Sequence, residues 1–346
     1  MMARAFITGL SGHVITADER AFLRAALPWG LILFKRNVQS ASQLSVLIDS
    51  FKEQVGRDDV PVLIDQEGGR VQRLGPPEWP AYPPGAAYGR LYDRDPSVGL
   101  AAAELGGRLI AADLAAVGIT VDCLPIADLP VSGADQVIGD RAYGDTPVKV
   151  ATIAKALTEG LAAGGVLPVL KHLPGHGRAT ADSHLRLPVV TADRATLEAT
   201  DFAAFRPLAT LPLGMTAHVV FTAIDPDLPA TTSATIIGQV IRGFIGFGGL
   251  LMSDDISMGA LSGSLAARTR AALAAGCDVA LHCNGNLAEM EQVAGAAPEL
   301  GGEAARRANG SLATRRAPTP IDIAAARAQF ADLMQGAADA RSEASA

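Results

Sequence analysis

Eight short apolar segments alternate along the chain with longer, alanine-rich segments. The apolar segments span residues 5–10, 30–34, 60–65, 119–126, 166–171, 214–220, 249–254 and 279–283. Their nearly continuous apolar character is typical of parallel strands that are buried on both faces. Helix-like segments at 41–55, 98–117, 147–163, 236–245 and 264–275 separate most of them. Eight strand–helix units predict a single α/β domain, a (β/α)8 TIM-type barrel, with a doubly wound sheet as the alternative.

The length of 346 residues suits one such barrel with insertions. Internal repeats are lacking, and so is a linker rich in proline, serine or glycine that would divide the chain. We therefore expect a catalytic barrel over residues 1–334, closed by a helix at 321–334, and a disordered tail at 335–346. The proline-rich segment 76–86 is expected to form a rigid excursion at the surface.

Composition narrows the classes of partner. The net charge is −7 and runs of Lys or Arg are no longer than two, so a nucleic-acid partner is not expected. The three cysteines, Cys123, Cys277 and Cys283, are too few for a disulfide framework and are expected to be reduced. A signal-peptide pattern and an apolar run of membrane-spanning length are both lacking. The sequence predicts a soluble, cytoplasmic protein without a membrane partner.

Two polar clusters follow the third and fourth predicted strands, where a barrel places its functional residues. In the first, at 64–73, Asp65 can accept hydrogen bonds from ligand hydroxyl groups, or it can form an ion pair with an arginine that only fixes the loop. In the second, at 138–144, Arg141 can point into a cleft, oriented by Asp140 or another acid. A surface salt bridge in a turn is the plainer interpretation of the second cluster.

The segment 171–184 is the most informative, because it holds three of the six histidines and is long and polar. One interpretation is a metal site built from His172, His176, Asp182 and His184. The other is a proton-transfer pair, in which Asp182 orients His184 and supports its charged form. The spacing matches no familiar zinc pattern, which favours proton transfer. Ordinary loop hydrogen bonding remains an alternative, above all for His176.

The seventh predicted strand ends at Asp254, which is expected to point into the barrel mouth as a nucleophile, base or metal ligand. Asp255 is expected to point away and to serve as a helix N-cap or in an ion pair. His218 and Asn284 follow the sixth and eighth strands. Each is either a cleft residue or a satisfied packing residue.

Several strings, in order along the chain, resemble glycoside hydrolase family 3, and within it the bacterial β-N-acetylhexosaminidases. They are LFKRN (33–37), IDQEGGRVQR (64–73), IGDRAYG (138–144), KHLPGHG with DSH (171–184) and MSDDISM (252–258). The resemblance implies a barrel enzyme that removes terminal β-linked N-acetylglucosamine from peptidoglycan fragments during cell-wall recycling. The implied substrate is N-acetylglucosamine linked to 1,6-anhydro-N-acetylmuramic acid, with or without its peptide.

The resemblance also implies roles for residues. Asp254 corresponds to the nucleophile, His184 to the acid/base and Asp182 to its partner. Sugar-binding positions of the family correspond to the following residues: Asp65, Arg73, Arg141, Lys171 and His172. A retaining reaction through a covalent glycosyl-aspartate follows from these roles, without metal or cofactor. We expect a monomer.

Two departures from the family pattern, Leu173 and Arg178-Ala179, lie in the loop that carries His184 and bear on its dynamics. Because a retaining reaction needs the acid and the nucleophile about 5–5.5 Å apart, we expect the loop to have open and closed states. Three alternatives remain at this point. They are hydrolysis assisted by the substrate's acetamido group, with Asp254 and Asp255 as adjacent carboxylates; a metal-dependent hydrolase; and a sugar-binding protein without activity.

Overall fold

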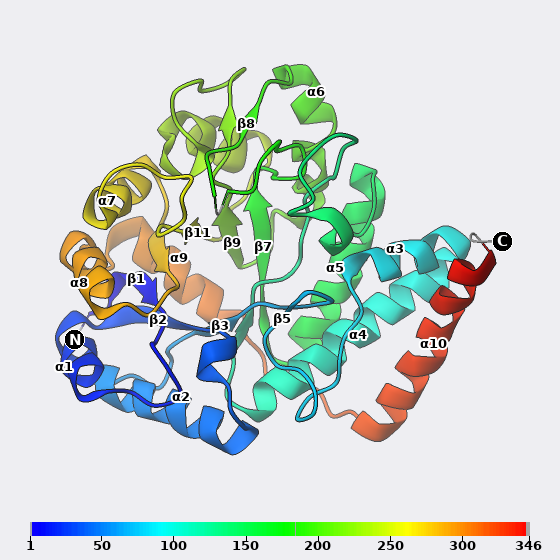
Figure 1. Ribbon diagram of the computed structural model, residues 1–346, viewed down its shortest axis with the longest axis horizontal. Helices are drawn as coiled ribbons and strands as arrows, with labels where there is room; N and C mark the ends of the chain where they lie inside the picture. The colour runs from blue at the N-terminus through cyan, green and yellow to red at the C-terminus, as the bar shows by residue number, and fades with distance from the viewer. Residues whose placement is uncertain (1, 184, 344–346) are drawn as a thin grey trace.

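The structure, a computed structural model, describes residues 2–183 and 185–343. Eight parallel strands form a closed barrel in the order β1-β12-β11-β9-β7-β6-β3-β2, and helices surround it (Figure 1). The strands are β1 (Arg4–Thr8), β2 (Pro28–Leu33), β3 (Val62–Ile64), β6 (Val121–Asp122), β7 (Leu167–Leu173), β9 (Leu213–Thr216), β11 (Leu250–Asp255) and β12 (Val279–His282). Each lies within or overlaps one predicted apolar segment. The predicted (β/α)8 barrel is confirmed, and the doubly wound alternative is wrong.

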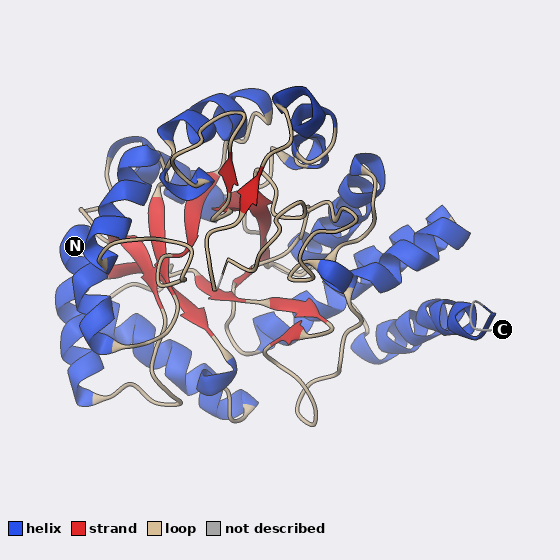
Figure 2. Ribbon diagram, turned by 45° about the horizontal axis from the view of Figure 1, so that its top comes forward, coloured by secondary structure: helices blue, strands red, loops and turns tan. Residues whose placement is uncertain are grey.

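The strands are buried on both faces, as their continuous apolar character predicted. In β3, the side chain of Leu63 packs in the barrel interior, whereas Val62 and Ile64 pack in the outer core under the helices. Figure 2 shows the strands at the centre of the molecule and the helices around them. This arrangement leaves the two ends of the barrel as the surfaces where polar groups can gather.

Several of the α-helices begin at a side-chain cap. The bounds of the α-helices are α1 (Ala17–Ala26), α2 (Ala41–Val55), α3 (Gly85–Arg94), α4 (Pro96–Ala116), α5 (Pro147–Ala163), α6 (Arg194–Ala199), α7 (Leu265–Ala275), α8 (Leu287–Ala296), α9 (Gly302–Ala313) and α10 (Ile323–Glu343). The predicted helices 41–55 and 147–163 match α2 and α5. Ser40 and Thr146 cap them, because each side chain accepts a hydrogen bond from a backbone N–H of the first turn.

The remaining helical segments are short or irregular. The segment predicted as a helix at 236–245 is a π-helix, η6 (Ile236–Phe244), between two barrel strands. The short 3₁₀ turns are η1 (Lys35–Asn37), η2 (Gly139–Arg141), η3 (Phe202–Ala204), η4 (Arg206–Leu208) and η5 (Ala230–Thr232). One of them, η2, carries Arg141 at the mouth of the barrel.

Two small sheets lie outside the barrel. In the first, β4 (Gln66–Gly68) pairs antiparallel with β5 (Val71–Gln72) through Gly68 and Gly69, which both have positive φ. In the second, β8 (Val189–Val190) pairs parallel with β10 (Val220–Phe221). The first sheet continues directly from β3 and therefore holds the polar cluster 64–73 at the strand end.

The C-terminal helix α10 lies beside α3 and α4 (Figure 1). Arg327 of α10 pairs with Asp113 of α4 at 2.7 Å, and the Tyr82 hydroxyl donates to the same carboxylate at 2.6 Å. The helix was expected at 321–334, and its observed bounds run further, into the segment expected as a tail. The division of the chain at residue 334 stays a prediction. Among the helices that the structure describes, none combines the length and the apolar character that crossing a bilayer requires.

Candidate active site

A cleft of about 310 Å³ opens where the barrel strands end at their carboxyl side. Its volume lies near the lower bound of roughly 300–1,000 Å³ for small-molecule pockets, which suits one sugar ring better than a long oligomer. Seven of the eight predicted site residues line it: Asp65, Arg73, Arg141, Lys171, His172, Asp182 and Asp254. The eighth, His184, lies outside the described residues.

Lys171, at the end of β7, is the centre of a buried ion-pair network. Its Nζ contacts Asp65 Oδ1 at 2.9 Å and Glu67 Oε1 at 2.7 Å, and only 2% of its side chain is exposed. Asp65 also pairs with Arg73 at 2.9 Å. Burial alone would lower the pKa of Lys171, but Asp65 and Glu67 outweigh burial and raise the pKa above its ordinary value. The ammonium group therefore stays charged at neutral pH.

The same balance holds for the carboxylates of the network. Burial acts to raise the pKa of Asp65, yet Lys171 and Arg73 hold it far below its usual value. Burial likewise opposes ionisation of Glu67, whose pKa is nevertheless lowered by Lys171 and Arg141. Both carboxylates are thus ionised acceptors at neutral pH. The ion pair between Asp65 and an arginine, which was the alternative interpretation, is present with Arg73. Both residues of this pair line the cleft.

Arg141 does reach the cleft, and Glu67 is the acid that orients it. Its Nε and Nη2 contact the two oxygens of Glu67 at 2.8 and 2.9 Å, a two-point geometry that fixes the guanidinium plane. Asp140 instead pairs with Arg70 at 3.1 Å, with about half of each side chain exposed. The surface salt bridge of the plainer interpretation is therefore present, but it belongs to Asp140 and not to Arg141.

Sequence reasoning missed Asp128, a fully buried carboxylate that follows β6. It contacts His172 Nδ1 at 2.6 Å and accepts a hydrogen bond from the His176 backbone N–H at 2.6 Å. Burial works against ionisation, but His172 and His176 lower the pKa of Asp128. Because the Asp128 carboxylate is the partner of His172 Nδ1, the other ring nitrogen, Nε2, remains available to a ligand in the cleft. The signal was an aspartate within the apolar string PIADLP, two residues beyond the predicted strand.

His176 proves to be a buried loop residue, as its plainer interpretation held. Its Nε2 lies 3.0 Å from the Ser183 hydroxyl, and its ring packs edge-on to His172 with centroids 5.9 Å apart. Burial, with a smaller contribution from His172, lowers the pKa of His176 to about 4. The imidazole is therefore neutral at physiological pH. Over the described residues, no group of three or more His, Cys, Asp or Glu side chains is arranged to hold a metal ion.

Asp254, the penultimate residue of β11, lies at the cleft, and its Oδ1 accepts a hydrogen bond from the backbone N–H of Asp255 at 2.8 Å. The expectation that Asp255 points away is wrong, because Asp255 lines the same cleft. Its carboxylate accepts hydrogen bonds from the N–H and the hydroxyl of Ser257 at 3.0 and 2.7 Å. These bonds close a turn after β11, so Asp255 caps a turn rather than a helix.

The last two candidate residues do not line the cleft: His218 is a satisfied packing residue, and Asn284 is an exposed residue that is hydrogen-bonded within its own loop and to α8. His218 is fully buried, with its ring nitrogens 2.7 Å from the Thr231 hydroxyl and 2.9 Å from the Asp255 carbonyl. Asn284 donates to the carboxylate of Glu289 in α8 and accepts from the backbone N–H of Asn286. Both residues stabilise the loops around the cleft without lining it.

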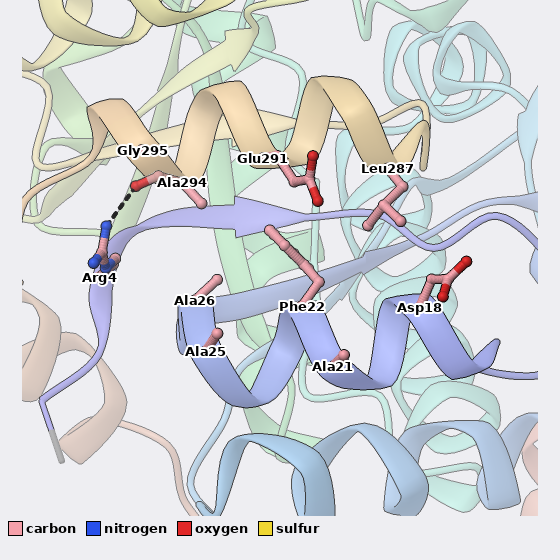
Figure 3. Close-up of a pocket in the computed structure, with 10 residues that line it drawn as sticks. All are labelled: Arg4, Asp18, Ala21, Phe22, Ala25, Ala26, Leu287, Glu291, Ala294 and Gly295. Carbon is pink, nitrogen blue, oxygen red and sulfur yellow. Dashed lines mark hydrogen bonds between the residues drawn. The ribbon is translucent and has the colours of Figure 1, made fainter.

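A larger hollow of about 540 Å³ lies between α1 and α8, on the outside of the barrel (Figure 3). Most of its lining residues are apolar, namely four alanines, Phe22 and Leu287. The Arg4 guanidinium donates a hydrogen bond to the Ala294 carbonyl at 2.8 Å. Asp18 and Glu291 are its acidic groups. This hollow lacks the paired cations and carboxylates of the cleft, so volume does not identify the reactive site here.

The cleft thus has two halves with different chemistry. At the ends of β3 and β7, cations and carboxylates are paired and buried, which fixes donors and acceptors for a polar, uncharged ligand such as a sugar. At the end of β11, Asp254 faces the cleft together with Asp182 from the loop after β7. Carboxylates placed beside a sugar site are the groups that glycosidic bond hydrolysis uses.

Comparisons with known proteins agree with this geometry. Residues 6–309 match the glycosyl hydrolase family 3 N-terminal domain. The chain is 42% identical over 290 residues to a β-hexosaminidase from Alkalilimnicola ehrlichii, covering 82% of each chain. It is similar to the crystal structure of native NagZ from Neisseria gonorrhoeae, with a TM-score of 0.84, 31% identity and 97% of each chain covered.

A second crystal structure of that NagZ, in complex with N-trifluoroacetyl-D-glucosamine, superposes with a TM-score of 0.81 and 32% identity, covering 96% of this chain and 99% of the other. The family match, the curated relatives and the barrel all agree with the resemblance of the sequence motifs. The chain belongs to glycosyl hydrolase family 3 and is a glycoside hydrolase whose relatives are β-hexosaminidases.

Proposed function

We propose that this chain is a retaining exo-β-N-acetylglucosaminidase that acts on peptidoglycan fragments. The observation that carries the proposal is that Asp254 and Asp182 line one small cleft with the paired sugar-binding groups. Relatives named β-hexosaminidase, and a relative bound to an N-acylated glucosamine, support the choice of sugar. The proposed substrate is N-acetylglucosamine linked to 1,6-anhydro-N-acetylmuramic acid, with or without peptide.

In the proposed reaction, Asp254 attacks the anomeric carbon while His184 protonates the leaving oxygen. Water, deprotonated by His184, then releases the sugar from Asp254. Asp182 supports the charged imidazolium in the first step, since a carboxylate beside an imidazole favours its protonated form. An imidazole has an ordinary pKa near roughly 6.5 and can act as acid and then base at neutral pH.

Binding falls to the rest of the cleft in this proposal. Asp65 and Arg73, joined at 2.9 Å, offer an acceptor and donors to sugar hydroxyls, and Lys171 and His172 offer further donors from the end of β7. Arg141, held by Glu67, contributes from η2. Because these groups are already oriented by one another, little reorganisation accompanies sugar binding.

The decisive experiment is hydrolysis of a chromogenic N-acetylglucosamine β-glycoside by the wild type, His184→Ala and Asp254→Asn. We expect turnover by the wild type and a loss of about 10³-fold or more for Asp254→Asn, because a nucleophile in a unit of this kind is not replaceable. His184→Ala should lose less on substrates with good leaving groups. Lack of turnover by the wild type would support a sugar-binding protein without activity.

Two rival mechanisms have their own tests. Isolation of a peptide that contains Asp254 and carries one covalent sugar excludes hydrolysis by the substrate's acetamido group. Full activity in excess chelator excludes a metal-dependent reaction through His172 and His176. Release of N-acetylglucosamine from an anhydro-disaccharide, compared with chitobiose, tests the fragment preference.

The place of action and the assembly are also part of the proposal. Cell-wall fragments that return to the cell are met in the cytoplasm, so we propose a cytoplasmic monomer. Cell fractionation with an antibody tests the location. Light scattering tests the monomer, and a dimer at micromolar concentration would contradict it.

A further inference from the structure

The first part of the loop after β7 is fixed to the barrel. Gly177 packs so closely on Leu129 that an added Cβ would lie 2.1 Å from its carbonyl oxygen. The Arg178 guanidinium pairs with the buried carboxylate of Asp201 at 2.8 Å, and the Ala179 carbonyl accepts the Asp135 N–H at 2.9 Å. Arg178, one of the departures from the family pattern, thus anchors this loop. These contacts fix the loop as far as residue 179.

His176 belongs to the fixed part, and its ring reaches the part that follows. Its backbone N–H donates to Asp128, and its Nε2 lies 3.0 Å from the Ser183 hydroxyl. Within the described residues its Nδ1 is buried and lacks a hydrogen-bond partner. A buried N–H without an acceptor is rarer than a buried lone pair without a donor. We therefore assign the proton to Nε2, which donates to the Ser183 oxygen.

Ser183 is the residue between Asp182 and His184 in the sequence. Its side chain is buried, and its backbone carbonyl accepts the Ala260 N–H at 3.1 Å. Ala260 lies in the loop after β11, the strand that carries Asp254. Ser183 is therefore held from both sides, by its hydroxyl on the fixed part of its own loop and by its carbonyl on the loop after the predicted nucleophile.

We propose that the His176–Ser183 hydrogen bond is a latch that holds Asp182, the predicted partner of the acid/base, at the cleft. His176 and Ser183 border the cleft, but the His176 Nε2 and the Ser183 hydroxyl are bonded to each other, so we assign both as positioning residues that act through Asp182 and His184. This inference rests on the proposed function, in which His184 protonates the leaving oxygen. Without the latch, the loop loses one buried hydrogen bond, whereas the sugar-binding groups at the ends of β3 and β7 keep their own ion pairs.

The test compares kcat/KM of Ser183→Ala with that of the wild type on two N-acetylglucosamine β-glycosides, one with a nitrophenyl and one with an alkyl leaving group. Loss of a hydrogen bond of ordinary strength lowers kcat/KM for the alkyl glycoside about 3- to 10-fold. The nitrophenyl glycoside, which needs little protonation, should lose less than about twofold. Ser183→Thr keeps the hydroxyl and should restore the alkyl rate. Thr180→Ala, which removes an exposed hydroxyl of the same loop, is the matched control and should match the wild type.

His184→Ala, run in the same assay, separates the two hypotheses. If His184→Ala loses far more on the alkyl glycoside but Ser183→Ala behaves like the wild type or loses equally on both substrates, the latch is refuted and the proposed function stands. If His184→Ala loses equally on both substrates, the acid role itself fails. Should Ser183→Ala fold poorly by circular dichroism, His176→Asn removes the same bond from the other side. If His176→Asn then has the same ratio of kcat/KM on the two glycosides as the wild type, the latch is refuted.

Discussion

Replacing Glu67 by glutamine tests whether the buried ion pairs hold the site together. The carboxylate is 3% exposed and receives three charge-assisted contacts, from Lys171 Nζ at 2.7 Å and from Arg141 at 2.8 and 2.9 Å. Glutamine keeps the shape, but it turns an amide N–H toward one of the cations. Arg141 is then left with a buried and uncompensated charge. We therefore expect the free energy of unfolding to fall by about 3–5 kcal/mol.

Asp140→Asn is the matched control, because it also neutralises a carboxylate that pairs with an arginine near the mouth of the barrel. The Asp140 side chain is 51% exposed and its partner Arg70 is 47% exposed. Such a surface pair contributes at most about 1 kcal/mol. Urea titration at pH 7, followed by circular dichroism, measures the free energy of unfolding of both variants. Equal losses would refute the argument that burial makes the Glu67 pairs strong.

The pH dependence gives an independent check on Glu67. Its pKa is lowered in the folded protein from an ordinary value of 4.5. A lowered carboxyl pKa stabilises the fold above the ordinary value, and this contribution is lost as the pH falls through the folded-state pKa. The difference between wild type and Glu67→Gln should therefore be constant from pH 7 down to about 5 and should shrink below about 4.5. A difference that grows in acid would contradict this assignment.

Two further predictions concern the loop and its support. Asp128→Asn replaces one of the two acceptor oxygens by an NH2 donor, so that His172 Nδ1 and the His176 N–H can no longer both find an acceptor. We expect kcat/KM to fall about 10- to 100-fold, by analogy with the loss of carboxylates that orient histidine ligands. Rates on the chromogenic substrate measure this effect, and an unchanged rate would contradict the orienting role. Gly177→Ala forces a Cβ against the Leu129 carbonyl. We therefore expect both the melting temperature and the activity to fall. A variant that is as stable and as active as the wild type would show that the loop is not packed as described.

The barrel could be predicted from the sequence because its strands are buried on both faces and therefore read as apolar runs. Helices α2 and α5 were predicted at their observed bounds, because Ser40 and Thr146 cap a periodic segment. Helix α9 was not predicted, because its apolar side contributes few buried residues and its charged residues dominate the pattern. Segment 236–244 has helical periodicity, but the sequence pattern does not separate a π-helix from an α-helix.

The site was predicted in part, for reasons that depend on distance along the chain. Asp65, Lys171 and Asp254 end apolar strands, and that local pattern alone placed them at the barrel mouth. Glu67 and Asp128 went unassigned, because their importance comes from partners that the fold brings close. Asp128 lies 44 residues from His172, and neither spacing nor composition reports such a pair.

The charged groups of the cleft lie on two sides, one at the ends of β3 and β7 and one at Asp182 and Asp254. On the side of β3 and β7, three cations (Arg73, Lys171 and Arg141) pair with two carboxylates (Asp65 and Glu67), which leaves one net positive charge. Lys171 and Glu67 are buried at the centre of this group, whereas Arg73 is partly exposed. A substrate hydroxyl can exchange for water there without moving the protein. The proposed acid arrives on a loop, where its approach can be coupled to the presence of substrate. If loss of the loop contact displaced the sugar-binding side, Ser183→Ala would weaken sugar binding. The arrangement instead predicts that Ser183→Ala changes how the rate depends on the leaving group and leaves the affinity for the sugar unchanged.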